Sequence, residues 1–314
     1  MFKHFIYNLL QVLTVLIFSP LTVGVLNKLK EMVQSKKGPS IFQPYRDLIK
    51  LFTKEEVISE ESSFIFRITP YIVFIAPIFV TLLIPVLTDY PLFWAFMADM
   101  VGGGFVLALA GFFTTLAAID TGNPYGPMGA SRTRMVGFLA EPIFIIVFFT
   151  VSFVANSTIP FIVQQKWVNP LSNFFEPEHI LILVAFFMLI LAEKGRIPVD
   201  NPSGHFELAM IDESKTLEYS GKSAALMKWG GWMKFFVLMC IFLNVLVTPW
   251  GLAHNLKISS LLIAIPLILF KIFIFVIALV IVESSLSKLR LFRITEFMTA
   301  SFVCAVIGMF ASIL

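Results

Sequence analysis

Long apolar stretches alternate with shorter polar ones along the whole chain. A membrane-spanning helix needs about 20 predominantly apolar residues. Stretches near that length predict eight spanning helices, at residues 5–27, 70–88, 100–119, 136–156, 179–193, 230–250, 258–282 and 294–313. The pattern therefore predicts an all-α, polytopic membrane protein, with one membrane domain over residues 1–314. The fifth span is the shortest, unless the residues after Pro177 belong to it.

The first apolar run is predicted to remain in the chain as an anchor. It is too long for the apolar core of a typical signal peptide and has no cleavage site of small residues. Lysines follow it in a stop-transfer pattern, at Lys28, Lys30, Lys36 and Lys37.

Between the first two spans, residues 41–54 predict an amphipathic helix. Apolar and charged side chains separate onto opposite faces at helical spacing. The apolar face has Tyr45, Leu48, Ile49 and Phe52, and the charged face has Arg46, Asp47, Lys50 and Lys54. We expect this helix to lie in the membrane interface or against the bundle. On that face Asp47 can form a surface pair with Arg46 or Lys50.

The long polar segment 194–229 is rich in carboxylates and predicts an irregular cytoplasmic loop. Pro198 and Pro202 remove backbone donors, and Gly195 and Gly204 loosen the chain. Irregular backbone near a bilayer needs a protein cover or a water-filled space. The carboxylates therefore face either a wet cavity or bulk solvent. They are Asp200, Glu207, Asp212, Glu213 and Glu218, with Glu193 just before the loop.

Composition and charge distribution support the membrane assignment and predict its orientation. The chain is 58% hydrophobic and 14% charged, with a mean hydropathy of +0.89. Four segments on one side hold 18 of the 23 lysine and arginine residues; they are 28–69, 120–135, 194–229 and 284–293. Positive loops stay in the cytoplasm. Both termini are therefore predicted to lie outside.

Charged residues inside the spans are the sharpest functional candidates, because a charge at bilayer depth is costly and needs a partner. Glu141 lies inside the fourth span and Lys271 near the middle of the seventh. A buried carboxyl can take up and release protons near neutral pH. The alternative for Glu141 is a structural ion pair with Arg132, Arg134 or Arg196. Two further carboxylates, Glu193 and Glu283, lie at cytoplasmic helix ends, where they oppose the helix dipole and need compensation.

The sequence carries no signature of a redox centre. Cys240 and Cys304 lie far apart in apolar runs, and the four histidines lack metal-ligand spacing. We find no nucleophile elbow, phosphate-binding loop or zinc signature, so no metal site and no catalytic residue is predicted, and a nucleic-acid partner is excluded.

Several motifs resemble one family. They are AE-x-x-R-x-P-x-D at 192–200, EL at 207–208, EYSG at 218–221, QPYRDLIKLFTKE at 43–55 and GASRTRMVGFLAE at 129–141. The chain resembles the membrane subunit that joins the hydrophilic and membrane arms of respiratory complex I and of group 4 membrane-bound [NiFe] hydrogenases. AIDTGNPYGPMGASR at 118–132 and ESSLSKLRLFR at 283–293 are similar to the hydrogenase branch, hydrogenase-4 component C and the corresponding formate hydrogenlyase subunit.

The resemblance implies a membrane anchor and coupling subunit in the cytoplasmic (inner) membrane of a prokaryote. It implies a proton pathway through Glu141, Glu193, Asp200, Glu207, Glu218, Lys271 and Glu283. Residues expected to support the loop and interface are Arg46, Asp47, Arg132, Arg134, Arg196 and Tyr219. Expected partners are large and small hydrogenase-like soluble subunits, an iron–sulfur subunit and antiporter-like membrane subunits. Nickel–iron and iron–sulfur centres are expected on those partners, with no cofactor on this chain.

Two alternatives remain. In a quinone-reducing relative of complex I, the cavity under residues 192–221 would admit a lipid-soluble quinone. A stand-alone secondary transporter would show paired repeats with broken helices in matching positions, and we find no such repeats.

Overall fold

The computed structural model describes residues 2–59, 62–90, 99–167, 176–200, 213–247, 250–254, 258–287, 289–290 and 293–313. Their helices are α1 (Phe2–Val33), α2 (Gln43–Thr53), α3 (Phe64–Leu83), α4 (Met100–Ile119), α5 (Tyr125–Ala155), α6 (Pro160–Trp167), α7 (Pro177–Glu193), η3 (Glu213–Thr216), α8 (Gly221–Cys240), the π-helical η4 (Ile241–Val247), α9 (Ile258–Ser285) and α10 (Arg293–Ala311). This helical content confirms the predicted fold class.

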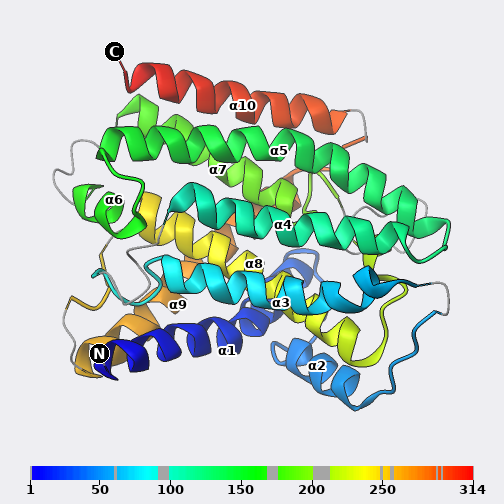
Figure 1. The fold of residues 1–314 in the computed structure, drawn as a ribbon. Helices are drawn as coiled ribbons and strands as arrows, with labels where there is room; N and C mark the ends of the chain where they lie inside the picture. The colour runs from blue at the N-terminus through cyan, green and yellow to red at the C-terminus, as the bar shows by residue number, and fades with distance from the viewer. Residues whose placement is uncertain are drawn as a thin grey trace.

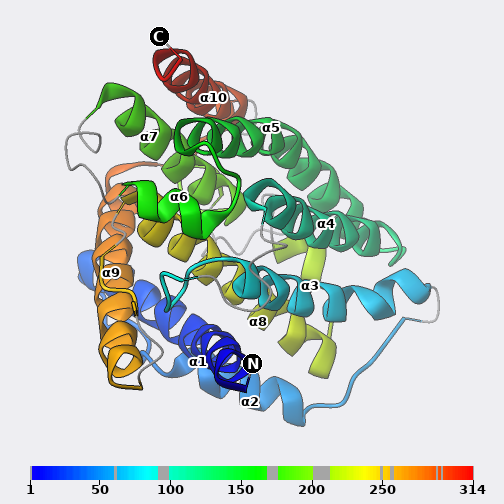
Figure 2. The ribbon, with the colours of Figure 1, turned by 60° about the vertical axis from the view of Figure 1, so that its left-hand side comes forward.

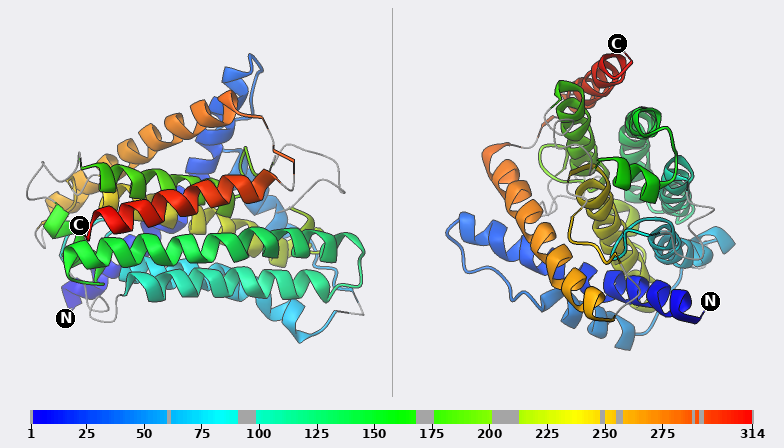
Figure 3. Two further views of the ribbon diagram at one scale, coloured as in Figure 1. Left: turned by 90° about the horizontal axis from the view of Figure 1, so that it is seen from above. Right: turned by 90° about the vertical axis from the view of Figure 1, so that its left-hand side faces the viewer.

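The long helices run side by side in one bundle that has two ends (Figure 1). The α2 end holds α2 and the loops joining α4 to α5 and α9 to α10. The α6 end holds α6 and both chain termini, as the views in Figure 3 also show. α8 lies in the interior, between α1 and α3 (Figure 2), and is the most buried of the candidate spans.

Within the described ranges, seven helices are long and apolar enough to cross a membrane: α1, α3, α4, α5, α8 with η4, α9 and α10. The predicted fifth span corresponds to α7, which has 17 residues. That length lies at the lower limit for crossing a bilayer, about 17 residues. α7 packs against both α10 and α5 in the bundle.

Helix boundaries differ from the predicted spans where polar residues join a helix or apolar residues leave one. α3 begins at Phe64 because the Ser63 hydroxyl accepts a hydrogen bond from Ile65 N at 3.2 Å and caps it. α5 begins at Tyr125, well before the apolar run, because polar residues continue the helix. Residues 84–87 are apolar but not helical, and they lie buried between helices.

The predicted amphipathic helix is α2, which packs against α1 and α8. Its Pro44 and Leu48 are buried, whereas Arg46 and Asp47 are exposed. The Tyr45 hydroxyl donates a hydrogen bond to the Ile17 carbonyl of α1. The chain entering α2 approaches Gly24 of α1 so closely that a Cβ at that position would lie 1.9 Å from the Ile41 oxygen.

Candidate functional site

A buried charge cluster lies at the α2 end of the bundle and contains Lys30, Arg196 and Glu283. Lys30 Nζ lies 3.3 Å from Glu283 Oε2, and Arg196 NH1 lies 3.7 Å from Glu283 Oε1. The Glu283 side chain is fully buried, and the cation side chains are about nine-tenths buried. Two cations therefore share one carboxylate that has no access to bulk water.

Three separate parts of the chain build this cluster. Lys30 continues the spacing of buried Val23 and Leu26 on the inner face of α1. Glu283 lies in the last turn of α9. Arg196 follows Gly195, whose φ of +52° ends α7 in the left-handed conformation that favours glycine.

The ion pairs of the cluster are loosely made. Lys30 Nζ and both carboxylate oxygens of Glu283 are buried, and none has a hydrogen-bond partner of good geometry among the described residues. A buried carboxylate normally accepts several hydrogen bonds. This carboxylate is consequently held by charge more than by hydrogen-bond geometry.

A second ion pair lies on the neighbouring helices. The Glu193 carboxylate, at the end of α7, accepts a 2.6 Å hydrogen bond from Lys234 Nζ of α8. Lys194 donates to the Gly231 carbonyl, and its amine lies 5.5 Å from the centroid of the Phe235 ring. Lys234 thus supplies the compensation that a carboxylate at a helix C-terminus requires.

Glu218 and Tyr219 are fixed just before α8. The Glu218 carboxylate accepts a hydrogen bond from the Asn123 amide. The Tyr219 hydroxyl donates to the Phe66 carbonyl at 3.0 Å, and the two rings stack with centroids 4.1 Å apart. Burial raises the pKa of Tyr219, so this phenol stays protonated and continues to donate.

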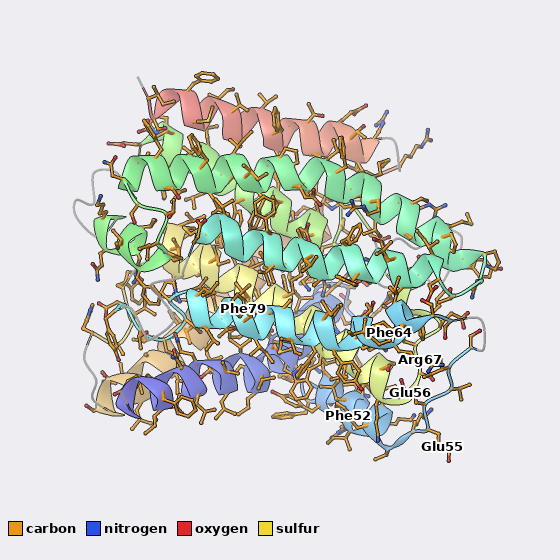
Figure 4. The ribbon with its side chains drawn as sticks, viewed as in Figure 1. Phe52, Glu55, Glu56, Phe64, Arg67 and Phe79 are labelled. Atoms are coloured by element: carbon orange, nitrogen blue, oxygen red, sulfur yellow. The ribbon has the colours of Figure 1, made fainter. Side chains whose placement is uncertain are left out.

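The chain after α2 is tied to the start of α8, in the region around the labelled Glu55 and Glu56 in Figure 4. Val57 N donates to Ser220 Oγ at 2.8 Å, and that hydroxyl donates to the Val57 carbonyl at 2.9 Å. The Glu56 carboxylate accepts from the Ser223 hydroxyl. The segments around Val57 and Tyr219 therefore form one connected surface at the α2 end.

The structure places Glu141 differently from the sequence expectation of a buried carboxyl. Its side chain is 44% exposed and lies 3.9 Å from Arg134 NH1. Both residues line an open groove of about 440 Å³ between α4 and α5, with apolar Phe105, Leu109 and Phe112 opposite. Position along an apolar run indicates depth, but the rotation of α5 turns this side chain outward.

The remaining candidates fall in several places. Asp200 is buried, and in the sequence it follows Arg196 of the charge cluster by four residues. Arg132 is partly buried on α5, and Asp47 accepts a 2.8 Å hydrogen bond from Gln43 on the surface of α2. Lys271 is buried near the middle of α9, more than three turns before Glu283 of the charge cluster. Glu207 lies outside the described residues.

Lys30, Lys234 and Asn123 were missed as site residues by reasoning from the sequence. Lys30 could have been found, because its spacing from Val23 and Leu26 places it on the buried face of α1. For Lys234 and Asn123 no local pattern indicates the partner, because each pairs with a residue far away in the chain.

Comparisons with known proteins cover nearly the whole chain. The NADH dehydrogenase family model matches residues 6–313. The chain is 32% identical over 288 residues to formate hydrogenlyase subunit 4 of Escherichia coli (strain K12), covering 91% of each chain. It is 31% identical over 289 residues to hydrogenase-4 component C of the same organism, covering 91% of this chain and 88% of that one.

More distant relatives share the family or the fold. NADH-ubiquinone oxidoreductase chain 1 of Triticum aestivum is 26% identical over 263 residues, covering 77% of this chain and 76% of that one. A chain of the membrane-bound sulfane sulfur reductase, an archaeal respiratory membrane complex, matches with a TM-score of 0.85 and 18% identity, covering 98% of this chain and 99% of that one. At that identity the likeness concerns the fold alone.

Proposed function

The chain belongs to the NADH dehydrogenase family, and from that premise we propose that it is the membrane anchor and coupling subunit of a hydrogenase-type, ion-translocating oxidoreductase complex. The similarity to formate hydrogenlyase subunit 4 and hydrogenase-4 component C supports the hydrogenase branch. The observation that carries the coupling role is the buried cluster of Lys30, Arg196 and Glu283.

In this proposal the cluster responds to charge changes in a subunit docked at the α2 end. A change in the redox state of that subunit alters the electrostatic potential over the cluster. Glu283 then shifts between Lys30 and Arg196, or takes up a proton, because a loosely held buried carboxylate responds strongly to a nearby charge. Coupling of this kind is a differential interaction with two states of the partner.

The proposed proton pathway starts from the carboxylates at the α2 end. Glu193 accepts a hydrogen bond from Lys234, and Glu218 accepts one from the Asn123 amide. Asp200 and Glu207 belong to the same proposed pathway through the polar loop. Glu141, near the middle of α5, would pass protons onward to a neighbouring membrane subunit.

The groove around Arg134 and Glu141 supports a membrane partner there. A half-exposed charged pair near the middle of a spanning helix is costly against lipid. We propose that an antiporter-like membrane subunit covers this groove. Large and small hydrogenase-like subunits and an iron–sulfur subunit are the proposed partners at the α2 end. They would carry the nickel–iron and iron–sulfur centres.

The proposed location is the cytoplasmic (inner) membrane of a prokaryote, with the α2 end facing the cytoplasm. The segments near that end contain 18 of the 23 lysine and arginine residues, as the positive-inside rule predicts for cytoplasmic loops. Both termini then lie outside, at the α6 end.

The test is Glu283→Gln in the assembled complex, with redox turnover and ion movement measured in the same sealed vesicles. We expect electron transfer to continue, while the number of ions moved per electron pair falls. The matched control is Glu296→Gln, which changes an exposed carboxylate in the first turn of α10. A wild-type ratio of ions to electrons in the Glu283→Gln complex would refute the coupling role.

A separate variant tests the route through α5. We expect Glu141→Gln to lower ion movement without disturbing Arg134 or the fold. The glutamine amide can still form a hydrogen bond, but it cannot carry a proton. If both redox turnover and proton pumping stay at wild-type levels, the proposed role of Glu141 fails while that of Glu283 stands.

A further inference from the structure

Lys271 is the centre of a second polar cluster, near the middle of α9. It follows the start of α9 by thirteen residues and is 4% exposed. Its amine donates to Asn244 Oδ1 at 3.2 Å and to the Trp250 carbonyl, and it lies 4.9 Å from the centroid of the Trp250 ring. A buried lysine near the middle of a spanning helix is by default a candidate for function, because its charge is costly at that depth.

The π-helical segment η4 positions the amide that holds Lys271. The Asn244 amide nitrogen donates to the carbonyls of Pro85 and Val86, at 2.9 and 3.1 Å. Those two bonds orient the amide, so its oxygen faces Lys271. π-helical turns occur frequently at functional sites.

Non-helical backbone enters the bundle beside this lysine. Ala253 N donates to the Leu87 carbonyl at 2.8 Å, which joins residues 84–90 to residues 250–254. The Lys271 backbone lies about 20 Å along α9 from its start, from the rise per residue. Because the lysine amine still reaches the Trp250 carbonyl, this irregular backbone lies well below the helix end. Backbone of this kind is tolerated at such depth where protein buries it or where it lines a water-filled space.

Buried polar atoms on and beside α1 favour the second possibility, a water-filled space. Gln11 Oε1 accepts from Val86 N and Leu87 N, at 3.1 and 3.0 Å. Within the described part of the chain, however, Gln11 Nε2, Asn8 Oδ1 and the hydroxyls of Tyr7 and Tyr90 are buried without a hydrogen-bond partner. The side chains of α1 among them are more than nine-tenths buried.

These atoms lie together. Tyr7, Asn8 and Gln11 share one face of α1, and the rings of Tyr7 and Tyr90 are 6.4 Å apart between centroids. Buried water commonly satisfies clustered polar atoms of this kind and makes about three hydrogen bonds. Gathered donors and acceptors next to irregular backbone therefore indicate a wet site.

We propose that the α6 end of the bundle encloses a hydrated polar centre, lined by Tyr7, Asn8, Gln11 and Tyr90, which connects Lys271 to the aqueous phase at that end. Lys271 exchanges protons through it. The ammonium gives one proton to a water molecule and becomes a neutral amine, and the reverse transfer restores the charge.

Other titratable groups surround this centre. The Cys240 thiol of α8 lies near Lys271, and the His179 ring of α7 lies near the Leu246 backbone of η4. At the rim, the exposed imidazole of His254 contacts the Asp89 carboxylate. That pair joins the two loops where the centre would open to solvent.

Hydration is tested by cysteine accessibility, which does not depend on the proposed function. The chain has two cysteines, so both are first changed to alanine in the assembled complex. Asn8→Cys is then compared with Val15→Cys, which substitutes a buried apolar residue two turns along α1. The probe is methanethiosulfonate ethyltrimethylammonium, whose permanent charge keeps it from crossing the membrane, added at the α6 side of sealed vesicles.

We expect Asn8→Cys to react at least about tenfold faster than Val15→Cys, because thiol modification requires water access to the thiolate. Equal rates at the two positions would overturn the hydrated centre, whether or not the complex moves ions.

Proton exchange is tested by Lys271→Arg, which keeps the cation but cannot release a proton. This arm rests on the proposed function. We expect the number of protons moved per electron pair to fall at least about fivefold, while electron transfer continues. A fivefold change corresponds to about 1 kcal/mol in the barrier to proton exchange. Lys222→Arg, at an exposed position of α8, is the control. If Lys271→Arg keeps the wild-type ratio of protons to electron pairs, while the separate variant Glu283→Gln lowers it, only the proposed role of Lys271 is overturned.

Discussion

Glu283 at the end of α9 and Lys30 near the end of α1 form a buried ion pair, with the carboxylate oxygen 3.3 Å from the amine. Arg196 approaches the same carboxylate from the segment after α7. One residue thus links three parts of the chain that are distant in sequence, at the end of the bundle where we propose that redox partners dock.

Removing the Glu283 carboxylate should destabilise the protein strongly. Glu283→Ala leaves Lys30 and Arg196 buried without this counter-charge, and breaking a buried pair costs about 3–5 kcal/mol. The measurement is the free energy of unfolding of the purified chain in detergent. Glu141→Ala is the control, because its half-exposed pair with Arg134 should contribute at most about 1 kcal/mol.

The triple variant Lys30→Met, Arg196→Met and Glu283→Leu tests whether the loss arises from charge, because it removes both cations together with the carboxylate that they share. Apolar side chains of similar size can replace buried ion pairs at little cost. We expect the triple variant to be more stable than Glu283→Ala. An equal or greater loss would show that the packing of these side chains, and not their charge, holds the two helices.

Gly24→Ala should displace α2 from α1. The added Cβ would lie 1.9 Å from the Ile41 carbonyl oxygen, so backbone must move. Overpacking of this kind costs about 1–3 kcal/mol. The measurements are the thermal unfolding midpoint and the rate of protease cleavage between α1 and α2. Gly111→Ala on α4, where an added Cβ meets nothing within 4 Å, should leave the cleavage rate unchanged and should not lower the midpoint, because alanine favours the helix. An unchanged cleavage rate in Gly24→Ala would contradict the close approach of the two helices.

The main elements of this fold could be predicted from the sequence because their physical causes are local. Apolar length predicts the spanning helices, and opposed apolar and charged faces predict α2. The start of α5 was not predicted, because the polar residues after Tyr125 give no apolar signal although they are helical. Residues 84–88 were assigned to a helix, because apolar composition alone does not separate helical from non-helical buried backbone.

The site was predictable only as a set of candidate charges. Glu283 and Arg196 were both identified, but their contact depends on how α7 and α9 pack. Glu141 was expected to be buried and is half-exposed, because depth in an apolar run does not determine which face of a helix a residue occupies. Partners such as Asn244 lie too far along the chain for any local pattern to indicate them.

Tyr219→Phe should remove one hydrogen bond and keep the ring stack with Phe66. The lost bond to the Phe66 carbonyl measures 3.0 Å, and its removal should cost about 1 kcal/mol at neutral pH. Tyr71→Phe, at an exposed position of α3, should cost nothing measurable. A loss of several kcal/mol in Tyr219→Phe would mean that the substitution also disturbs the stacked rings.

The same tyrosine gives a prediction for alkaline pH. Burial raises the pKa of Tyr219, so folding favours the protonated phenol. The stability from this hydroxyl is fully present below the unfolded-state pKa, about 10, and is lost as the pH rises above that value. The stability difference between wild type and Tyr219→Phe should therefore narrow above about pH 10. A constant difference up to the pH at which both proteins unfold would contradict the inferred burial.

The orientation of the bundle can be tested at its ends. The N- and C-termini both lie at the α6 end (Figure 3), whereas the loop after α4 lies at the α2 end. If lysine and arginine residues keep the α2 end in the cytoplasm, alkaline phosphatase fused to the C-terminus should be active, because that enzyme matures outside the cytoplasm. The same enzyme fused after Asp120, at the end of α4, should be inactive, and a green fluorescent protein there should fluoresce. The opposite pattern would invert the proposed sidedness, and would place the Lys271 centre on the cytoplasmic side.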